Sequence, residues 1–114
     1  MRRFAWIAFW STCFASVVLA AELTGPQIEE KVSGHNFAWR SDKFNESGVT
    51  TYYVDGTMII AVDGYAKERG KWRINGDQIC SYVGNNRENC SAVSQIDERT
   101  FFWNSHQTTA MRQD

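Results

Sequence analysis

The stretch GKWRINGDQIC, residues 70–80, decides the fold of this chain of 114 residues. Apolar Trp72 and Ile74 alternate with basic side chains, so an extended strand here has one apolar and one charged side. Gly76 and Asp77 interrupt the alternation with a pair that tolerates the positive φ angles of a tight hairpin. The segment therefore predicts a strand, a short turn and a second strand, with one face of the hairpin buried.

The same period of two recurs along most of the chain. Asp55-Gly56 supplies another hairpin turn, and residues 57–62 are apolar on both faces, which predicts a central strand whose second side is covered by a helix. Short runs rich in β-branched and aromatic residues are expected to form the strands: 36–40, 49–54, 57–62, 71–75, 78–83, 91–96 and 100–103.

One short amphipathic helix is expected over about residues 24–33, ahead of these strands. Thr24 is a suitable N-cap, and Gln27, three residues later, can reach back to it. Ile28 and Val32 stand four apart and share one face of the helix. The predicted fold class is α+β, mostly β: one N-terminal amphipathic helix packed on a curled antiparallel meander of about six or seven short strands, forming a partial barrel.

The N-terminus has the pattern of a secretory signal peptide. Arg2 and Arg3 precede an uncharged run over residues 4–21, which ends on small residues suited to cleavage after Ala20 or Ala21. The alternative is an uncleaved membrane anchor, because this run approaches the minimum length of a membrane span. The expected organisation is a signal peptide at 1–21, one disulfide-bonded β-rich domain at 22–104 and a flexible polar tail at 105–114.

The cysteine count fits an exported protein. Cys13 lies within the signal segment, which leaves Cys80 and Cys90 to pair with each other. Disulfides persist in oxidising compartments, so we expect a periplasmic or secreted location. The alternative is two free thiols in a reducing compartment. A domain of this size buries little apolar surface, and a covalent link would contribute a large share of its stability.

The charge of the chain argues against a nucleic-acid partner. The sequence holds 12 Lys and Arg against 13 Asp and Glu, and removal of Arg2 and Arg3 leaves 10 against 13, a net charge of −3. No stretch clusters basic residues, as phosphate binding or a polybasic membrane patch would require. Contact with a membrane is expected only through an uncleaved signal segment.

No catalytic constellation, metal-ligand pattern or cofactor motif is present in the sequence. Its two histidines, His35 and His106, are far apart, and no Gly-x-Ser-x-Gly elbow occurs. We therefore expect no catalytic residue, no metal and no cofactor. A pair of carboxylates for a hydrolase or lyase remains an alternative, because a fold could bring together two of five candidates: Asp42, Glu46, Asp55, Asp63 and Glu68.

The mature chain is rich in aromatic residues. Such residues form the core of a small β-domain or a recognition surface. Adjacent strand residues point to opposite faces, so of Tyr52 and Tyr53 one should be exposed. Trp39 and Tyr82 join these two as candidate ligand-binding residues, and the loop at 84–89 is a second candidate recognition element.

Residues 70–80, followed by Cys90, resemble a Gly-x-Trp-x-x-x-Gly-Asp-x-x-Cys pattern found in small exported proteins of Gram-negative bacteria. Those proteins are also similar in layout, with a signal peptide, a leading Leu-Thr-Gly helix and an Asp-Gly hairpin. The resemblance implies a periplasmic or secreted protein and assigns no activity. A looser similarity to lipocalins depends on Gly70-Lys71-Trp72, although in lipocalins this motif stands near the start of the chain.

Export, aromatic content and the lack of catalytic groups together favour a small non-enzymatic binding module. Its expected partner is a protein, a peptide or an envelope component, bound through one sheet face or the loop at 84–89. Two other functions remain: a carboxylate-dependent hydrolase or lyase, and a structural or toxin-neutralising protein that docks through a sheet edge.

Overall fold

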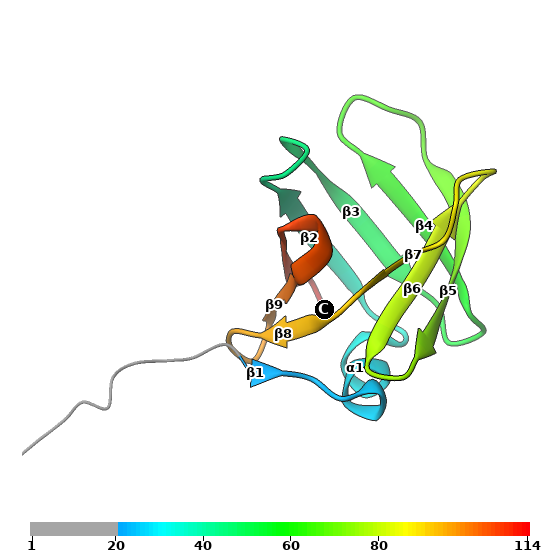
Figure 1. Cartoon of the computed structure of the whole chain (residues 1–114). Helices are drawn as coiled ribbons and strands as arrows, with labels where there is room; N and C mark the ends of the chain where they lie inside the picture. The colour runs from blue at the N-terminus through cyan, green and yellow to red at the C-terminus, as the bar shows by residue number, and fades with distance from the viewer. Residues whose placement is uncertain (1–20) are drawn as a thin grey trace, which may run out of the picture.

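The computed structural model describes residues 21–114, which form one antiparallel sheet and one α-helix (Figure 1). The spatial order of the ten strands is β1-β8-β9-β10-β2-β3-β4-β5-β6-β7. The strands are β1 (Ala21–Glu22), β2 (Asn36–Ser41), β3 (Glu46–Tyr52), β4 (Thr57–Val62), β5 (Glu68–Asn75), β6 (Gln78–Val83), β7 (Asn89–Ser91), β8 (Val93–Gln95), β9 (Thr100–Trp103) and β10 (Thr108–Arg112).

The two ends of the sheet meet in one continuous segment of chain. Only Ala92 separates β7 from β8, yet β7 pairs with β6 and β8 pairs with β9 on the far side of the order. The sheet therefore curls around an interior, as the prediction of a curled meander required. Most successive strands are neighbours joined by short turns, and β10 pairs with β2 to connect the last strand with the first long one.

The strand count exceeds the predicted six or seven for three reasons, the first of which is the two-residue strand β1 ahead of the helix. The expected run at 91–96 divides at Ala92 into β7 and β8, because its halves pair with different strands. Residues 108–112, expected to lie in a flexible tail, instead form β10 between β9 and β2. The tail prediction was wrong because a strand between two partners needs few apolar residues: Ala110 alone is buried in β10, at 3% exposure.

The predicted helix is confirmed as α1 (Gly25–Val32), with the expected capping box. Thr24 N donates to Gln27 Oε1 at 2.9 Å, and the Thr24 side chain accepts from Gln27 N. The helix is not the N-terminal element, because β1 precedes it. It also does not cover the outer face of β4 as expected: Figure 1 shows it across one end of the curled sheet, where fully buried Ile28 and Val32 enter the interior.

The hairpin predicted from residues 70–80 is formed by β5 and β6, and its turn anchors the helix. Gly25 N donates to Asp77 Oδ1 at 2.7 Å, across 52 residues of sequence. A Cβ at Gly25 would lie 2.1 Å from Gly76 O, so the helix can approach this turn only with glycine at its first position. The turn residues thus hold α1 at its end of the sheet.

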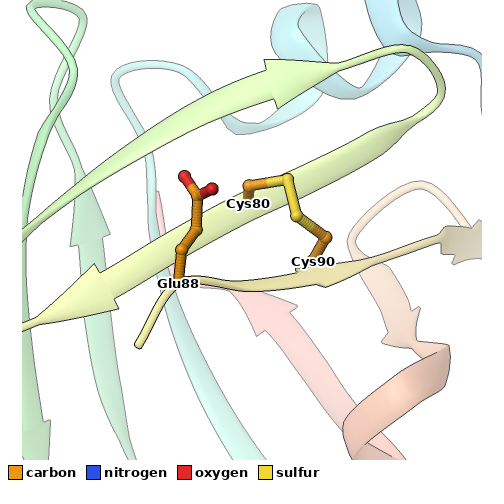
Figure 2. A group of neighbouring side chains, drawn as sticks. All are labelled: Cys80, Glu88 and Cys90. Carbon is orange, nitrogen blue, oxygen red and sulfur yellow. A yellow bond between two sulfur atoms is a disulfide. The ribbon is translucent and has the colours of Figure 1, made fainter. Parts of the chain in front are cut away.

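A disulfide joins Cys80 to Cys90, as predicted, and links the neighbouring strands β6 and β7 (Figure 2). Arg73 reinforces this region with two hydrogen bonds of 2.9 Å to Glu88, in the loop that connects the two strands. In the chain-entropy model, closing a loop of about ten residues contributes about 2–3 kcal/mol. The loop at 84–88 is therefore fixed at its C-terminal end by a covalent bond and a bidentate ion pair.

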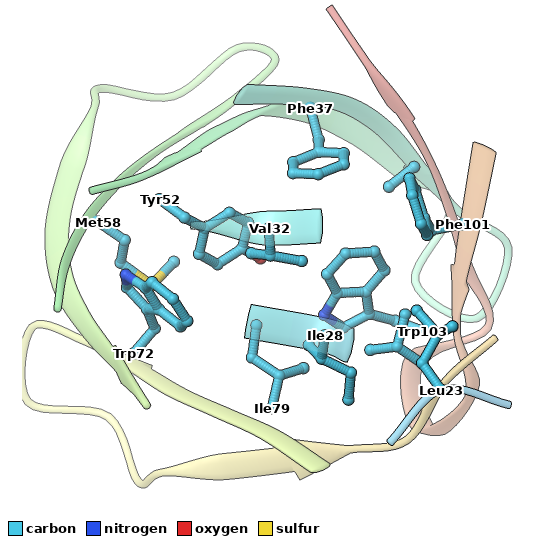
Figure 3. Close-up of a cluster of buried hydrophobic side chains, with 12 residues drawn as sticks. Leu23, Ile28, Val32, Phe37, Tyr52, Met58, Trp72, Ile79, Phe101 and Trp103 are labelled. Atoms are coloured by element: carbon cyan, nitrogen blue, oxygen red, sulfur yellow. The ribbon is translucent and has the colours of Figure 1, made fainter. Parts of the chain in front are cut away.

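The core lies inside the curled sheet next to the helix. Figure 3 shows aromatic and aliphatic side chains pointing inward from the surrounding strands, together with Ile28 and Val32 from α1. Phe37 is at its centre, with edge-to-face contacts to three rings at centroid distances of 5.8–5.9 Å: Tyr52, Phe101 and Trp103. This cluster fills the end of the interior that α1 closes.

The contact between the helix and the hairpin turn can be tested through Asp77. Replacing Asp77 by Ala removes the acceptor for Gly25 N and should lower the free energy of unfolding by about 1–2 kcal/mol. Asp77→Asn keeps Oδ1 as an acceptor, so its free energy of unfolding should fall by clearly less. Urea unfolding followed by tryptophan fluorescence measures both values; equal losses in the two variants would show that the hydrogen bond does not hold the helix.

Candidate ligand-binding cavity

A cavity of about 460 Å³ occupies the part of the curled sheet that the core does not fill. Its lining comes from seven strands and from the connections β2–β3, β6–β7 and β9–β10. All three connections stand at the ends of strands that run away from α1, so the cavity opens at the end of the sheet opposite the helix. The volume falls within the range of pockets that hold small organic ligands.

Tyr52 and Trp103 form the base of the cavity, where it meets the core. Their side chains are 7% and 8% exposed, and their rings lie nearly parallel with centroids 6.3 Å apart. Neither Tyr52 Oη nor Trp103 Nε1 has a hydrogen-bond partner among residues 21–114. Burial raises the pKa of the Tyr52 hydroxyl, so this group stays neutral and can donate a hydrogen bond to a ligand.

The apolar wall runs along β2, β3 and β4. Trp39 lies on this wall, and its Nε1 donates to Thr50 Oγ1 at 2.9 Å, which fixes the indole against the sheet. Ile60 continues the apolar surface on the next strand. A Cβ at Gly48 would meet the Trp39 ring at 2.8 Å, so glycine there leaves the space that this ring occupies.

The opposite wall comes from β6 and β7 and is more polar, although Ile79 and Val83 also belong to it. Ser91 Oγ donates to Ala92 O and accepts from Ser105 N, so it is fully engaged in holding the chain. Ser81 lines the cavity and has no hydrogen-bond partner within the described part of the chain. One side of the cavity is thus aromatic and aliphatic, and the other offers hydroxyl groups.

The mouth of the cavity carries the charged residues. Lys43 on the β2–β3 connection donates to Ser105 O at 3.4 Å and lies 5.5 Å from the Phe44 ring centroid. The Phe44 ring is 6.0 Å from the ring of His106, which ends the 3-10 helix η2 (Asn104–His106). Burial of His106, together with Lys43, lowers the pKa of its imidazole. Glu46 and Arg87 complete the charged lining.

The four candidate ligand-binding residues do not lie together. Trp39 and Tyr52 line the cavity, whereas Tyr53 is 43% exposed outside it. One tyrosine of the adjacent pair is thus buried and the other exposed, in keeping with strand alternation. Tyr82 contributes to the cavity lining with its ring partly in solvent, and it also borders a shallow outer hollow of about 320 Å³ that includes Tyr53.

Several cavity residues were not identified from the sequence, among them Lys43, Ser81 and His106, and Arg87 was covered only by the candidate loop at 84–89. The sequence pattern could have identified Ser81, because this residue stands between Ile79 and Val83 at the inward-facing positions of β6. A polar residue on a buried face indicates either a hydrogen bond or a cavity. No such pattern indicated His106, because its segment was expected to be a tail.

The carboxylates are dispersed. Of the five candidates only Glu46 lines the cavity. Asp55 accepts hydrogen bonds from Thr57 in the β3–β4 turn, and Asp63 accepts one from Ser47 at 2.7 Å. His35 pairs with Asp114 at 3.0 Å, far from His106 in the fold. The residues that the structure describes place no second acid and no acid–histidine pair in the cavity.

One group of three potential metal ligands occurs within residues 21–114: Cys80, Glu88 and Cys90 (Figure 2). Both sulfur atoms are bonded to each other, and Glu88 is paired with Arg73, which lowers the pKa of its carboxyl group. A thiolate is the form that binds a metal, so the disulfide removes two of the three ligands. This group is a covalent link between strands.

Comparisons of the chain with protein-family models, curated proteins and solved structures found no match. Within residues 21–114, no helix has the length and apolar character needed to cross a membrane. The cavity itself therefore provides the argument about function.

The burial of Tyr52 predicts a pH dependence of stability. Above pH of about 10 this hydroxyl ionises in the unfolded chain while the folded protein retains the proton. The unfolded state then binds fewer protons, so stability falls as the pH rises, by up to about 1.4 kcal/mol per pH unit. In Tyr52→Phe the unfolding free energy should fall less steeply between pH 10 and 11.5; equal slopes in urea unfolding experiments would contradict this.

Proposed function

We propose that this protein is an exported binding module that holds a small amphipathic molecule inside its curled sheet. The observation that carries the proposal is the base of the cavity, where Tyr52 and Trp103 are more than nine-tenths buried and offer unpartnered donors. Neither donor atom is among the inaccessible polar atoms of residues 21–114 that lack a partner, so both remain accessible from the cavity, where water or a ligand can accept their hydrogen bonds. A ligand with an apolar body and a few polar atoms fits this lining.

The rigidity of the surroundings supports binding over a structural role. The disulfide and the Arg73–Glu88 pair fix one side of the mouth, and the Phe37 ring cluster fixes the base. A preformed site loses less conformational entropy when the ligand binds. Each of these contacts therefore favours affinity for a small molecule.

The alternatives receive less support from the geometry. A carboxylate-dependent hydrolase or lyase needs two acids on one cavity, and Glu46 is the only acid on this one among the described residues. Docking through a sheet edge needs a row of unpaired backbone groups. The two end strands of the sheet, β1 and β7, have two and three residues, so the edges are short.

Filling the cavity should abolish binding of a neutral apolar probe. N-phenyl-1-naphthylamine fluoresces in apolar surroundings and has no charge. Ser81→Phe places a ring on the polar wall, so we expect the probe to bind at least about tenfold more weakly. This change corresponds to a loss of roughly 1.4 kcal/mol of binding free energy. Fluorescence titration of the oxidised protein measures the dissociation constant.

Two further variants control this experiment. Thr109→Phe adds the same ring to the exposed outer side of β10 and should leave probe binding unchanged. Ser81→Leu adds a smaller group and keeps the test valid if Ser81→Phe folds poorly, as judged by thermal unfolding. Equal probe affinity in wild type and a folded Ser81 variant would place the probe outside the cavity and reject the proposal.

Export is the second part of the proposal. It is supported by the disulfide, which is compatible with an oxidising compartment, and by the pattern of residues 1–21, of which 1–20 lie outside the described residues. When the full chain is expressed in a Gram-negative bacterium, the envelope fraction should hold a product that begins at Ala21 or Glu22. Its intact mass should rise by about 2 Da on reduction. Full-length protein with two alkylated thiols in the cytosol would contradict export.

A further inference from the structure

We infer that the ligand of this cavity is an anionic amphipathic small molecule, bound with its apolar body at the base and its negative head group between Lys43 and Arg87 at the mouth. This inference rests on the proposed function and adds the chemical class of the ligand. The head group is a carboxylate, a sulfonate or a phosphate, which share the acceptor oxygens that a guanidinium binds.

The charges that line the cavity carry the inference. Its charged side chains are Lys43, Arg87 and Glu46, so cations outnumber anions two to one. Residues 21–114 as a whole show the reverse, with 10 basic and 13 acidic side chains after Arg2 and Arg3 are subtracted from the chain total. A positive excess at the mouth of an otherwise acidic domain favours entry of an anion.

Neighbouring acids do not neutralise this excess, because they have other partners. Glu88 stands next to Arg87 in sequence, but both of its oxygens accept from Arg73. Asp42 stands next to Lys43 and lies 3.8 Å from Arg40. Within residues 21–114, neither Lys43 nor Arg87 has an acidic partner within ion-pair distance.

Lys43 has contacts that hold it at the mouth, and Arg87 lies on a loop that is tethered there. Lys43 is fixed between the β2–β3 connection and η2 by its bond to Ser105 O and its place over the Phe44 ring. Arg87 belongs to the loop that ends at the disulfide-linked strand β7. The lowered pKa of His106 leaves its imidazole neutral at pH 7, so the positive charge at the mouth comes from these two residues.

The depth of the cavity separates the two parts of the ligand. The base is aromatic and contains no charged side chain: Tyr52 and Met58 come from strand ends near the helix, and the Trp103 ring packs against Tyr52 from the end of β9. The charges occur only on the connections and strand ends at the mouth. At a water share of about 30 Å³, the cavity has room for roughly 15 water-sized groups, which suits one or two fused rings or a short alkyl chain.

Two fluorescent probes that differ in one sulfonate test the inference. 8-Anilinonaphthalene-1-sulfonate carries the negative group, and N-phenyl-1-naphthylamine is the same skeleton without it. In Lys43→Gln/Arg87→Gln we expect the sulfonate probe to bind about three- to tenfold more weakly, the range for two partly exposed ion pairs. The neutral probe should change by less than about twofold, because its contacts lie at the base.

Further variants separate local charge from net charge. Lys31→Gln/Lys67→Gln removes two positive charges that line neither the cavity nor the outer hollow and should leave both probes unaffected. Glu46→Gln removes the one acid and should tighten only the sulfonate probe, by up to about fivefold. Raising the salt concentration from 50 to 500 mM should weaken the sulfonate probe alone, since screening acts on the ion pairs.

The outcomes distinguish this inference from the proposed function. One outcome is that filling at Ser81 weakens binding of the neutral probe, whereas Lys43→Gln/Arg87→Gln leaves the affinity for the sulfonate probe unchanged. The cavity then binds ligands, and the anionic class is wrong. An equal loss of sulfonate-probe affinity in the Lys31→Gln/Lys67→Gln control would assign the effect to net charge and overturn the inference. If neither probe responds to filling at Ser81, the proposed function itself fails.

Discussion

The seal that α1 forms at one end of the curled sheet is the constraint on which the rest of the structure depends. Ile28 and Val32 close that end, and the Gly25–Asp77 hydrogen bond holds the helix on the β5–β6 turn. Core residues gather against the helix and leave the other end of the interior unfilled. A second covering element would have produced a filled core without a binding cavity.

A domain this small has to stabilise an incompletely filled interior. Protein interiors are normally close-packed, and a cavity forfeits contacts that would otherwise stabilise the fold. The disulfide links β6 and β7, two strands that line the cavity, and the contacts of Phe37 with Tyr52, Phe101 and Trp103 concentrate aromatic packing in the remaining core. Covalent linkage and dense aromatic packing thus compensate for the volume that the cavity leaves unfilled.

The base of the cavity is aromatic and its mouth is charged, so the two ends of the cavity differ in chemistry. A ligand can lose water from its apolar part at Tyr52 and Trp103 while its charged part remains near solvent, where ionisation costs little. In the binding mode that we propose, Lys43 and Arg87 attract the anionic head group and the donors at the base hold the rest of the ligand.

The sequence by itself determined the local elements and the covalent link. The hairpin at 70–80, the capped helix, the Cys80–Cys90 pair and the opposite exposure of Tyr52 and Tyr53 follow from interactions between residues close in sequence, or from a count of cysteines. Trp39 and Tyr52 were also identified as candidate binding residues before their place in the cavity was known.

Only the tertiary structure decided where the helix packs, that residues 108–112 form a strand, and which side chains share the cavity. β10 has a weak local pattern and exists because β2 and β9 supply backbone partners on both sides. Lys43, Arg87 and His106 are separated by 44 and 19 residues in sequence and meet only because three connections end at the same mouth. The sheet closes because strands that are far apart in sequence pair with each other, and no local pattern of residues predicts such pairing.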